Sequence, residues 1–235
     1  MTHRHRPRGL DIVYEDRDLL IVDKSAGLLT MSFHKDQDRT AEVLLNDYVR
    51  KGCIRSRNRV FLVHRLDRET SGLLVFARSE AVQQHLKDHW QDTHKFYLAA
   101  VHGHLEKRSG LISTYLAEDE DQFVRSVQDP QAGRLAQTEY WVIKETHTLS
   151  LLKIRLLTGR KNQIRVHFAE RGHPVVGDPK YGRRNRSGGD MALHAKSLAL
   201  DHPRTGQRLC LETAIPERFQ RLANGLTEED WAGRP

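Results

Sequence analysis

The chain has 235 residues, of which 38% are hydrophobic and 29% are charged. This balance excludes an intrinsically disordered chain, and apolar runs no longer than a strand exclude a membrane-spanning helix. Lysine and arginine number 38 against 31 aspartates and glutamates, a formal net charge of +7. Such an excess of positive charge favours a polyanionic partner, with RNA or DNA as the first candidates.

The N-terminal sequence MTHRHRPRGL is basic, and no apolar segment follows it, so we expect no secretory signal. The two cysteines, Cys53 and Cys210, form neither a disulfide framework nor a zinc-binding spacing. We therefore expect a cytoplasmic protein.

The first third of the chain predicts two short strands about a charged turn at residues 11–23, and KSAG at 24–27 ends the second strand. Apolar residues at helical spacing then predict a helix over 40–49, with Thr40 as its N-cap. Two further apolar runs, at 60–63 and 72–77, flank the loop HRLDRETSG. Ser79 is the expected N-cap of the next helix, whose buried face carries Val82, Leu86 and Trp90.

The rest of the chain predicts mainly strands. The polar segment 105–134 is expected to hold only short strands and turns. In the strand at 149–156, Lys153 and Arg155 alternate with apolar residues, which predicts one buried and one solvent-exposed face. The other strands are expected at 95–101, 123–124, 138–143, 193–200 and 208–212, and helices at 162–170 and 216–222.

Because strands outnumber helices and short turns join most of them, we expect an α+β fold with a mixed, largely antiparallel central β-sheet flanked by helices and loops. We expect a single catalytic domain over residues 11–223, a basic N-terminal tail over 1–10 and a loose C-terminal tail over 224–235.

The loop HRLDRETSG places Asp67 between Arg65 and Arg68. A loop aspartate beside arginines is usually a surface ion pair worth under about 1 kcal/mol. Two features favour a function instead. The loop runs between two strands and returns through Thr-Ser-Gly, which suits a fixed conformation, and a second arginine-rich turn, TGRKNQIRVH at 158–167, leads into a helix.

The segment HRLDRETSGLL resembles the signature of the RluA-type pseudouridine synthases. KFYLA at 95–99, TGRKNQIRVHFAERGHPVVGDPKYG at 158–182 and LHAKSLALDHPRTG at 193–206 are similar to three more motifs of that family, in the same order. The resemblance spans residues 13–219. It departs at Asn162, where the family usually has His, and at Ser25, where the family usually has Pro. We expect no N-terminal S4-type RNA-binding domain.

This resemblance implies an isomerase that converts uridines of ribosomal RNA, transfer RNA or both to pseudouridine without a cofactor or metal. It implies that Asp67 is the catalytic carboxylate, acting either as a nucleophile at C1′ or as a base at C2′, and both routes stay open. Arg165 is the implied cation that pairs with Asp67 and holds its carboxyl ionised. Tyr97 is the implied aromatic residue that stacks on the flipped uracil and helps to remove the C5 proton.

The substrate-binding residues follow from the same resemblance. Arg65 is expected to fill the space that the flipped uridine leaves, or to contact a phosphate, and Leu198 to pack against the apolar side of the base. Arg160, Gln163 and His64 complete the expected substrate-binding set.

Other functions find less support in the sequence. HRLD lacks the spacing of the kinase HRD loop, and no glycine-rich phosphate loop precedes it. The 14 histidines form no metal-binding motif, and His64 and His167 suit hydrogen-bonding support. A catalytically inactive RNA-binding protein or RNA chaperone with the same fold stays open. We expect a monomer that binds RNA and no membrane.

Overall fold

The computed structural model describes residues 7–31, 39–51, 53, 55–182, 190–223 and 225–233. The chain is organised as two compact units. Unit 1 comprises residues 1–93 and 197–213, and unit 2 comprises 94–196 and 214–235. The boundaries 11–223 that the sequence suggests for one catalytic domain stay a prediction.

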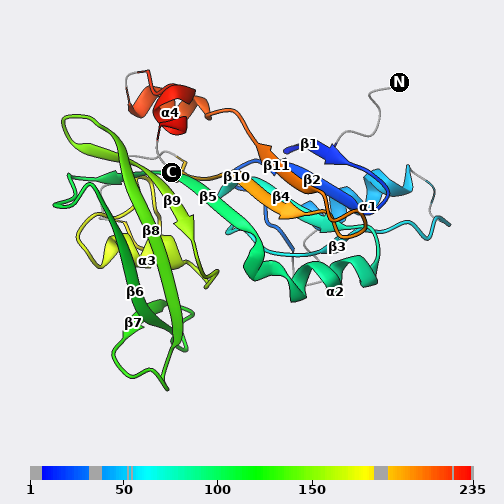
Figure 1. Cartoon of the computed structure of the whole chain (residues 1–235), viewed down its shortest axis with the longest axis horizontal. Helices are drawn as coiled ribbons and strands as arrows, with labels where there is room; N and C mark the ends of the chain where they lie inside the picture. Colours follow the sequence, from blue (N-terminus) through cyan, green and yellow to red (C-terminus); the bar gives the residue numbers. More distant parts are fainter. Residues whose placement is uncertain are drawn as a thin grey trace. The chain divides into compact units, whose positions relative to one another are not determined.

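Unit 1 is built on four strands in the order β1 (Leu10–Glu15), β2 (Leu19–Lys24), β4 (Ser71–Ala77) and β10 (Leu193–Asp201), whose residues 197–201 belong to this unit. Two more strands, β3 (Phe61–Leu62) and β11 (Arg208–Glu212), pair antiparallel with β4 and β10 (Figure 1). All seven residues of β4 are buried, as expected for a central strand with a continuous apolar run.

The helices of unit 1 begin where the sequence predicts. The helix α1 (Ala41–Arg50) is capped by Thr40, whose side chain accepts a hydrogen bond from the N–H of Val43. The helix α2 (Glu80–Asp88) is capped in the same way by Ser79, and Leu86 on its inner face is buried.

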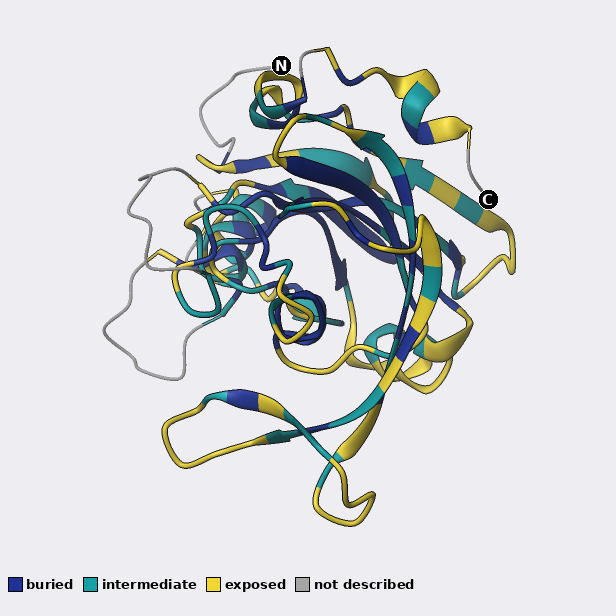
Figure 2. Cartoon of the chain, turned by 90° about the vertical axis from the view of Figure 1, so that its left-hand side faces the viewer, coloured by how far each residue is buried: buried dark blue, intermediate teal, exposed yellow. Residues whose placement is uncertain are grey.

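Unit 2 contains five antiparallel strands in the order β5 (His94–His102), β9 (Leu149–Leu156), β8 (Arg134–Glu145), β6 (Ser109–Glu118) and β7 (Val124–Val127). The helix α3 (Gln163–Ala169) packs against β7 and β8, and its residues 163–168 are buried. Figure 2 shows the contrast between these buried residues, in dark blue, and the exposed hairpin ends of this unit, in yellow. The predicted α+β fold with a largely antiparallel sheet is confirmed.

Three expectations for unit 2 are wrong, concerning the segment 105–134, the C-terminal tail and the face of the strand at 149–156 that carries Lys153. The sequence predicts only short strands in the segment 105–134, yet β6 is ten residues long, because it pairs on one side with β7 and on the other with β8. The sequence predicts a loose tail after residue 224, yet Glu228–Ala232 form the helix α5, which follows α4 (Glu217–Leu222). A capping box between Thr227 and Asp230 starts α5, and Trp231 is buried.

The helix α5 also explains why Lys153 is not on a solvent-exposed face. Lys153 is 8% exposed, its Nζ donates a hydrogen bond to the carbonyl of Trp231 (3.3 Å), and it lies 5.0 Å from the centre of the Trp231 ring. Lys196 pairs with Glu228 at 2.9 Å. The C-terminal helix therefore covers a face of β9 that its alternating sequence marks as exposed. In the described part of the chain, no helix is long and apolar enough to cross a membrane.

Candidate functional site

Asp67 lies in unit 1, in the loop between β3 and β4, where it is half-buried. Its neighbour Leu66 is buried, whereas Arg65 and Arg68 are exposed. The carbonyl of Asp67 accepts a hydrogen bond from the N–H of Thr70 (3.1 Å), which closes a turn immediately after the carboxylate.

A second segment of unit 1 fixes this loop on both sides of Asp67. On one side, Thr30 Oγ1 donates to the carbonyl of Leu66 (2.7 Å) and accepts from the Leu66 N–H (3.2 Å). On the other side, the N–H of Gly27 donates to the carbonyl of Arg68 (2.8 Å), and Arg68 Nε donates to the Gly27 carbonyl (3.1 Å). The prediction of a held loop is confirmed.

Lys24 strengthens the same connection from inside the unit. Its side chain is fully buried, and its Nζ donates to the carbonyls of Ser25 (3.0 Å), Leu28 (2.8 Å) and Arg68 (3.2 Å). A buried ammonium requires such partners, because its desolvation is otherwise costly. Ser25, which stands where the family usually has Pro, donates its N–H to the carbonyl of Gly9 (2.9 Å), a bond that proline has no N–H to make.

His64, expected among the substrate-binding residues, is half-buried and supports the start of the loop. Its Nε2 accepts a hydrogen bond from the N–H of Val75 in β4 (3.2 Å), and its ring stacks on Trp90 with a centroid distance of 4.7 Å. These contacts favour a supporting role for His64 over contact with a substrate.

Arg165 lies in unit 2, on α3, and is 3% exposed. Its Nε donates to Asp178 Oδ2 (2.7 Å) and its Nη2 to Asp178 Oδ1 (2.8 Å), so the two groups form a buried bidentate ion pair. The backbone N–H groups of Lys180 (2.8 Å) and Tyr181 (2.9 Å) also donate to Asp178 Oδ1. Burial alone would raise the pKa of Asp178, but the bonds from Arg165 and the backbone hold that pKa below its ordinary value.

Tyr181 completes the surroundings of Arg165. The Arg165 guanidinium lies 5.2 Å from the centre of the Tyr181 ring. The Tyr181 hydroxyl accepts from the N–H of Val124 (3.0 Å) and donates to Oδ1 of Asn162 (3.2 Å). Asn162 has a left-handed backbone conformation (φ 53°) directly before α3. The amide at this position therefore helps to fix the start of the helix that carries Arg165.

Gln163, predicted to bind substrate, is 2% exposed, and protein groups occupy its amide. Its Oε1 accepts from the N–H of Arg160 (2.9 Å) and the hydroxyl of Thr158 (2.8 Å), and its Nε2 donates to the carbonyl of Gln137 (2.9 Å) and to Thr138 Oγ1 (2.8 Å). Gln163 therefore joins the Thr-Gly-Arg turn to β8, which favours support over substrate contact. Arg160 itself is exposed, with its Nε on the carbonyl of Leu135 (2.9 Å).

His167 is fully buried between two threonines, 2.9 Å from both Thr138 Oγ1 and Thr114 Oγ1. Burial and the nearby Arg171 lower its pKa to about 4, so the imidazole is neutral near pH 7. The expected role of His167 as a hydrogen-bonding support is confirmed.

Tyr97 and Leu198 are both buried within strands. Tyr97 is on β5 in unit 2, opposite Ile154 of β9, and is 8% exposed. Leu198 is on β10, and its side chain belongs to the apolar core of unit 1 with Leu19, Ile21 and Val75. Their expected contacts with uracil stay predictions.

The predicted site residues thus fall into two groups. Asp67, Arg65 and His64 share one loop of unit 1, and Arg160, Gln163 and Arg165 share one turn and helix of unit 2. The pairing of Asp67 with Arg165 has one member in each unit and stays a prediction. Sequence reasoning missed three supports: Lys24, Thr30 and Asp178. The signal for Asp178 was its place in GDPKYG, and no local pattern marked Lys24 or Thr30.

The sequence holds two clusters of basic residues, one over 50–59 and one over 180–186, and the structure describes the first more fully than the second. Lys51, Arg55, Arg57 and Arg59 are exposed on unit 1. Arg57, Arg59 and Phe61 line a hollow of about 360 Å³, where Arg59 lies 5.7 Å from the centre of the Phe61 ring. In the second cluster only Lys180 is described, and Arg183, Arg184 and Arg186 lie outside the described residues.

One group of side chains in the described residues has the composition of a metal site: Asp16, Asp18 and His202. Their atoms are already bonded to protein. Asp16 accepts from Tyr14, His202 and two backbone N–H groups, and Asp18 accepts from both Nε and Nη2 of Arg204. The group is therefore an ion-pair cluster between the β1–β2 and β10–β11 turns.

Comparison with known proteins gives this arrangement its context. A family model described as RNA pseudouridylate synthase matches residues 18–170. A protein of Aquifex aeolicus, named an uncharacterized RNA pseudouridine synthase, is 36% identical over 93% of this chain and 73% of its own length. Ribosomal large subunit pseudouridine synthase D of Nitrosomonas europaea is 35% identical over 96% of this chain and 67% of its own length.

Solved structures that resemble this chain come from proteins with the same family name. Human RNA Pseudouridylate Synthase Domain Containing 1 matches with a TM-score of 0.72 and 26% identity, over 92% of this chain and 87% of that one. Human RNA Pseudouridylate Synthase Domain Containing 4, at 22% identity over 88% of this chain and 89% of that one, shares the fold with a TM-score of 0.73. The chain therefore belongs to the RNA pseudouridylate synthase family, within its RluA-type branch, and is by that membership an isomerase.

Proposed function

We propose that this protein isomerises a specific uridine of structured RNA, with Asp67 as the catalytic carboxylate. Ribosomal RNA is the first candidate substrate, because similar proteins carry the name ribosomal large subunit pseudouridine synthase D. Transfer RNA is the second candidate. The observation that carries the proposal is the fixed loop: Asp67 sits between two backbone anchors, the bonds of Thr30 at Leu66 and those of Gly27 and Lys24 at Arg68.

The reaction needs one ionised carboxylate and no external reactant. The N1–C1′ bond of uridine breaks, the uracil rotates, and a C5–C1′ bond forms, while the proton lost from C5 is balanced by the proton gained at N1. Asp67 either attacks C1′ or removes the C2′ proton. The half-buried position of Asp67 and its held backbone suit both steps, since the carboxylate must keep one direction as the base turns.

Arg165 is proposed as the partner of the Asp67 carboxylate. The bidentate pair with Asp178 fixes the orientation of the guanidinium plane. Tyr97 is proposed to stack on the uracil and to help remove the C5 proton. Arg65, exposed beside Asp67, is proposed to enter the space that the flipped uridine leaves, since a base inside a folded RNA must leave its stack first.

The basic surface of unit 1 supports RNA capture by the catalytic domain itself. The hollow at Arg57, Arg59 and Phe61 combines cations with one aromatic ring. Guanidinium groups contact phosphates, and an aromatic face stacks on bases without sequence preference.

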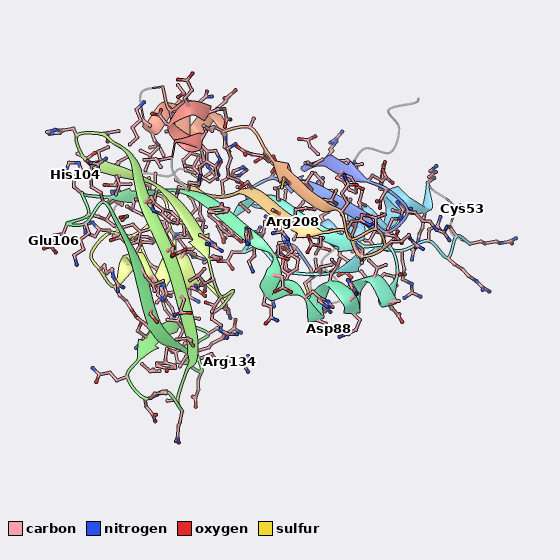
Figure 3. All side chains as sticks on the ribbon, viewed as in Figure 1. Cys53, Asp88, His104, Glu106, Arg134 and Arg208 are labelled. Atoms are coloured by element: carbon pink, nitrogen blue, oxygen red, sulfur yellow. The ribbon has the colours of Figure 1, made fainter. Side chains whose placement is uncertain are left out.

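Tritium release from RNA labelled at uridine C5 tests this function, with ribosomal and transfer RNA as separate substrates. Wild-type protein is expected to release tritium, and Asp67→Asn to release none while it still binds RNA. Asp88→Asn is the matched control, because Asp88 is an exposed carboxylate at the end of α2 in the same unit (Figure 3). Wild-type turnover by Asp67→Asn would refute the assignment. RNA binding without tritium release by the wild type would instead indicate an inactive RNA-binding protein or chaperone.

A further inference from the structure

A hollow of about 550 Å³ lies on unit 2, apart from the residues assigned above to catalysis. Its walls come from the end of β6, the start of β7, the β7–β8 turn and the turn at 159–161. Its lining includes Leu116 and Val124, which are buried and belong to the same apolar cluster as Val166, the residue after Arg165 on α3. Two buried apolar side chains therefore form part of the lining of the hollow.

The rim of the hollow is cationic. Arg134, Arg160 and Lys161 line it together with a single carboxylate, Glu118, so the lining carries three positive charges and one negative charge. Lys161 pairs with Glu118. Among the described residues, no acidic side chain pairs with Arg134, which is exposed at the start of β8 (Figure 3), or with Arg160.

The two arginines differ in how firmly they are held. Arg160 is fixed at its base, because its Nε donates to the carbonyl of Leu135 and its N–H to Gln163. Gly159 beside it leaves the hollow open, since a Cβ at that position would meet no atom within 4 Å. The turn thus presents one oriented guanidinium next to empty space, and Arg134 adds a second at the same hollow.

We propose that this hollow binds one nucleotide of the substrate RNA strand, with its phosphate on Arg134 and Arg160 and its sugar and base over Leu116 and Val124. The volume lies within the range of about 300–1,000 Å³ typical of small-ligand sites and exceeds what a phosphate alone needs. Guanidinium groups suit phosphate oxygens, and that of Arg160 is already held in place by its bond to Leu135. Phosphate contacts fix the position of a strand and carry no sequence information, so the contacts with Arg134 and Arg160 do not select a particular base.

This inference rests on the proposed function, because it takes the same RNA as ligand. The test therefore measures binding separately from chemistry. Fluorescence anisotropy with a labelled RNA stem-loop gives the affinity over a salt series, and tritium release gives kcat and KM. The variants are Arg134→Gln, which removes a cation, and Gly159→Leu, which fills the hollow without strain because Gly159 is not in the left-handed region. Arg108→Gln is the control, since Arg108 is an exposed arginine of the same unit that pairs with Glu145.

Affinity falls as salt rises, and Arg134→Gln is expected to make the plot of log affinity against log salt less steep by about 0.7–1, the contribution of one phosphate contact. Both Arg134→Gln and Gly159→Leu are expected to raise KM with little change in kcat, and Arg108→Gln to leave both unchanged. Affinities and slopes of both variants equal to those of Arg108→Gln would overturn the inference, even if tritium release proceeds. Absence of tritium release from the wild type would refute only the proposed reaction, because the anisotropy comparison still reports on the hollow.

A competition experiment with a mononucleotide distinguishes a site for the RNA strand from a site for a free nucleotide. Adenosine monophosphate is expected not to displace the labelled RNA at concentrations near the KM for RNA. Displacement from wild-type protein that Gly159→Leu abolishes would assign the hollow to free nucleotides and would overturn the RNA-strand proposal.

Discussion

The buried pair of Arg165 and Asp178 gives the sharpest prediction, tested by Asp178→Asn. The substitution keeps the size of the side chain and removes its charge. In the wild type, the Arg165 and Asp178 side chains are 4% and 0% exposed, and Asp178 accepts two bonds from the guanidinium and two from backbone N–H groups. An asparagine side chain has an NH₂ group in place of one carboxylate oxygen, and this group would face the N–H donors of Arg165 and the backbone. The substitution also removes the negative charge that balances the buried guanidinium.

Removing one partner of a buried ion pair costs about 3–5 kcal/mol. We therefore expect Asp178→Asn to lower the free energy of unfolding by about that amount. Glu145→Gln is the matched control, because Glu145 pairs with Arg108 at 2.7 Å but the two side chains are 30% and 59% exposed. An exposed pair contributes at most about 1 kcal/mol, so the control is expected to lose no more than that.

Urea denaturation of wild type, Asp178→Asn and Glu145→Gln, followed by far-UV circular dichroism, measures both losses. Tritium release then reports function: because Asp178 orients Arg165, turnover is expected to fall while RNA affinity, read by anisotropy, stays near the wild-type value. Arg165→Met is expected to show the same division between turnover and affinity. The reasoning fails if Asp178→Asn costs no more stability than Glu145→Gln, or if its turnover equals the wild-type value.

Two further predictions concern unit 1. Lys24→Met removes three hydrogen bonds from a buried ammonium to backbone carbonyls, and a hydrogen bond to a charged group is typically worth about 1.5–3 kcal/mol. We therefore expect the free energy of unfolding, measured by urea denaturation, to fall by at least about 2 kcal/mol, and turnover to fall while RNA affinity is retained. An unchanged unfolding midpoint would contradict the assigned role. Burial opposes ionisation of Asp16, but hydrogen bonds from Tyr14, Leu19, Asp18 and His202 lower its pKa from 3.8 to about 2. The ionised Asp16 therefore stabilises the folded protein fully above about pH 3.8, and this contribution is lost as the pH falls toward 2. Asp16→Asn is expected to reduce the fall in thermal midpoint across that window, and an identical fall in both proteins would refute the assignment.

The sequence predicted the elements that local patterns determine. Thr40 and Ser79 cap their helices as predicted, because an N-cap depends only on the residues that immediately follow it. The strands at 149–156 and 208–212 have the predicted limits, since a glycine-containing turn follows the first strand at 158–159 and another precedes the second at 205–207. The loop at Asp67 was also predictable, because its two flanking strands are strongly apolar.

The sequence did not predict the elements that depend on distant partners. Asp178 lies 13 residues after Arg165, and although it stands in GDPKYG, nothing in the sequence identifies it as the partner of Arg165. Lys24 reads as an ordinary strand-ending lysine, and only the carbonyls of the loop at Arg68 explain its burial. The alternation of polar and apolar residues around Lys153 is clear in the sequence, but the helix α5 that covers Lys153 is not. This helix is five residues long, and Trp231 is its one buried residue. Such a short polar helix depends on tertiary packing and gives little local signal.

The supports of the site also explain how the two departures from the family pattern can be tolerated. Ser25 and Asn162 both stand at supporting positions and not at the proposed reacting groups. Ser25 adds a backbone bond to Gly9 beside Lys24, and Asn162 accepts the hydroxyl of Tyr181, whose ring faces Arg165. Ser25 therefore adds a hydrogen bond that proline has no N–H to make, and Asn162 makes one through its side chain, each at the place where the loop or helix is anchored. Because the catalytic roles proposed for Asp67 and Arg165 depend on where these anchors hold them, a chain can change a residue at an anchor and retain the chemistry as long as the loop or helix stays anchored.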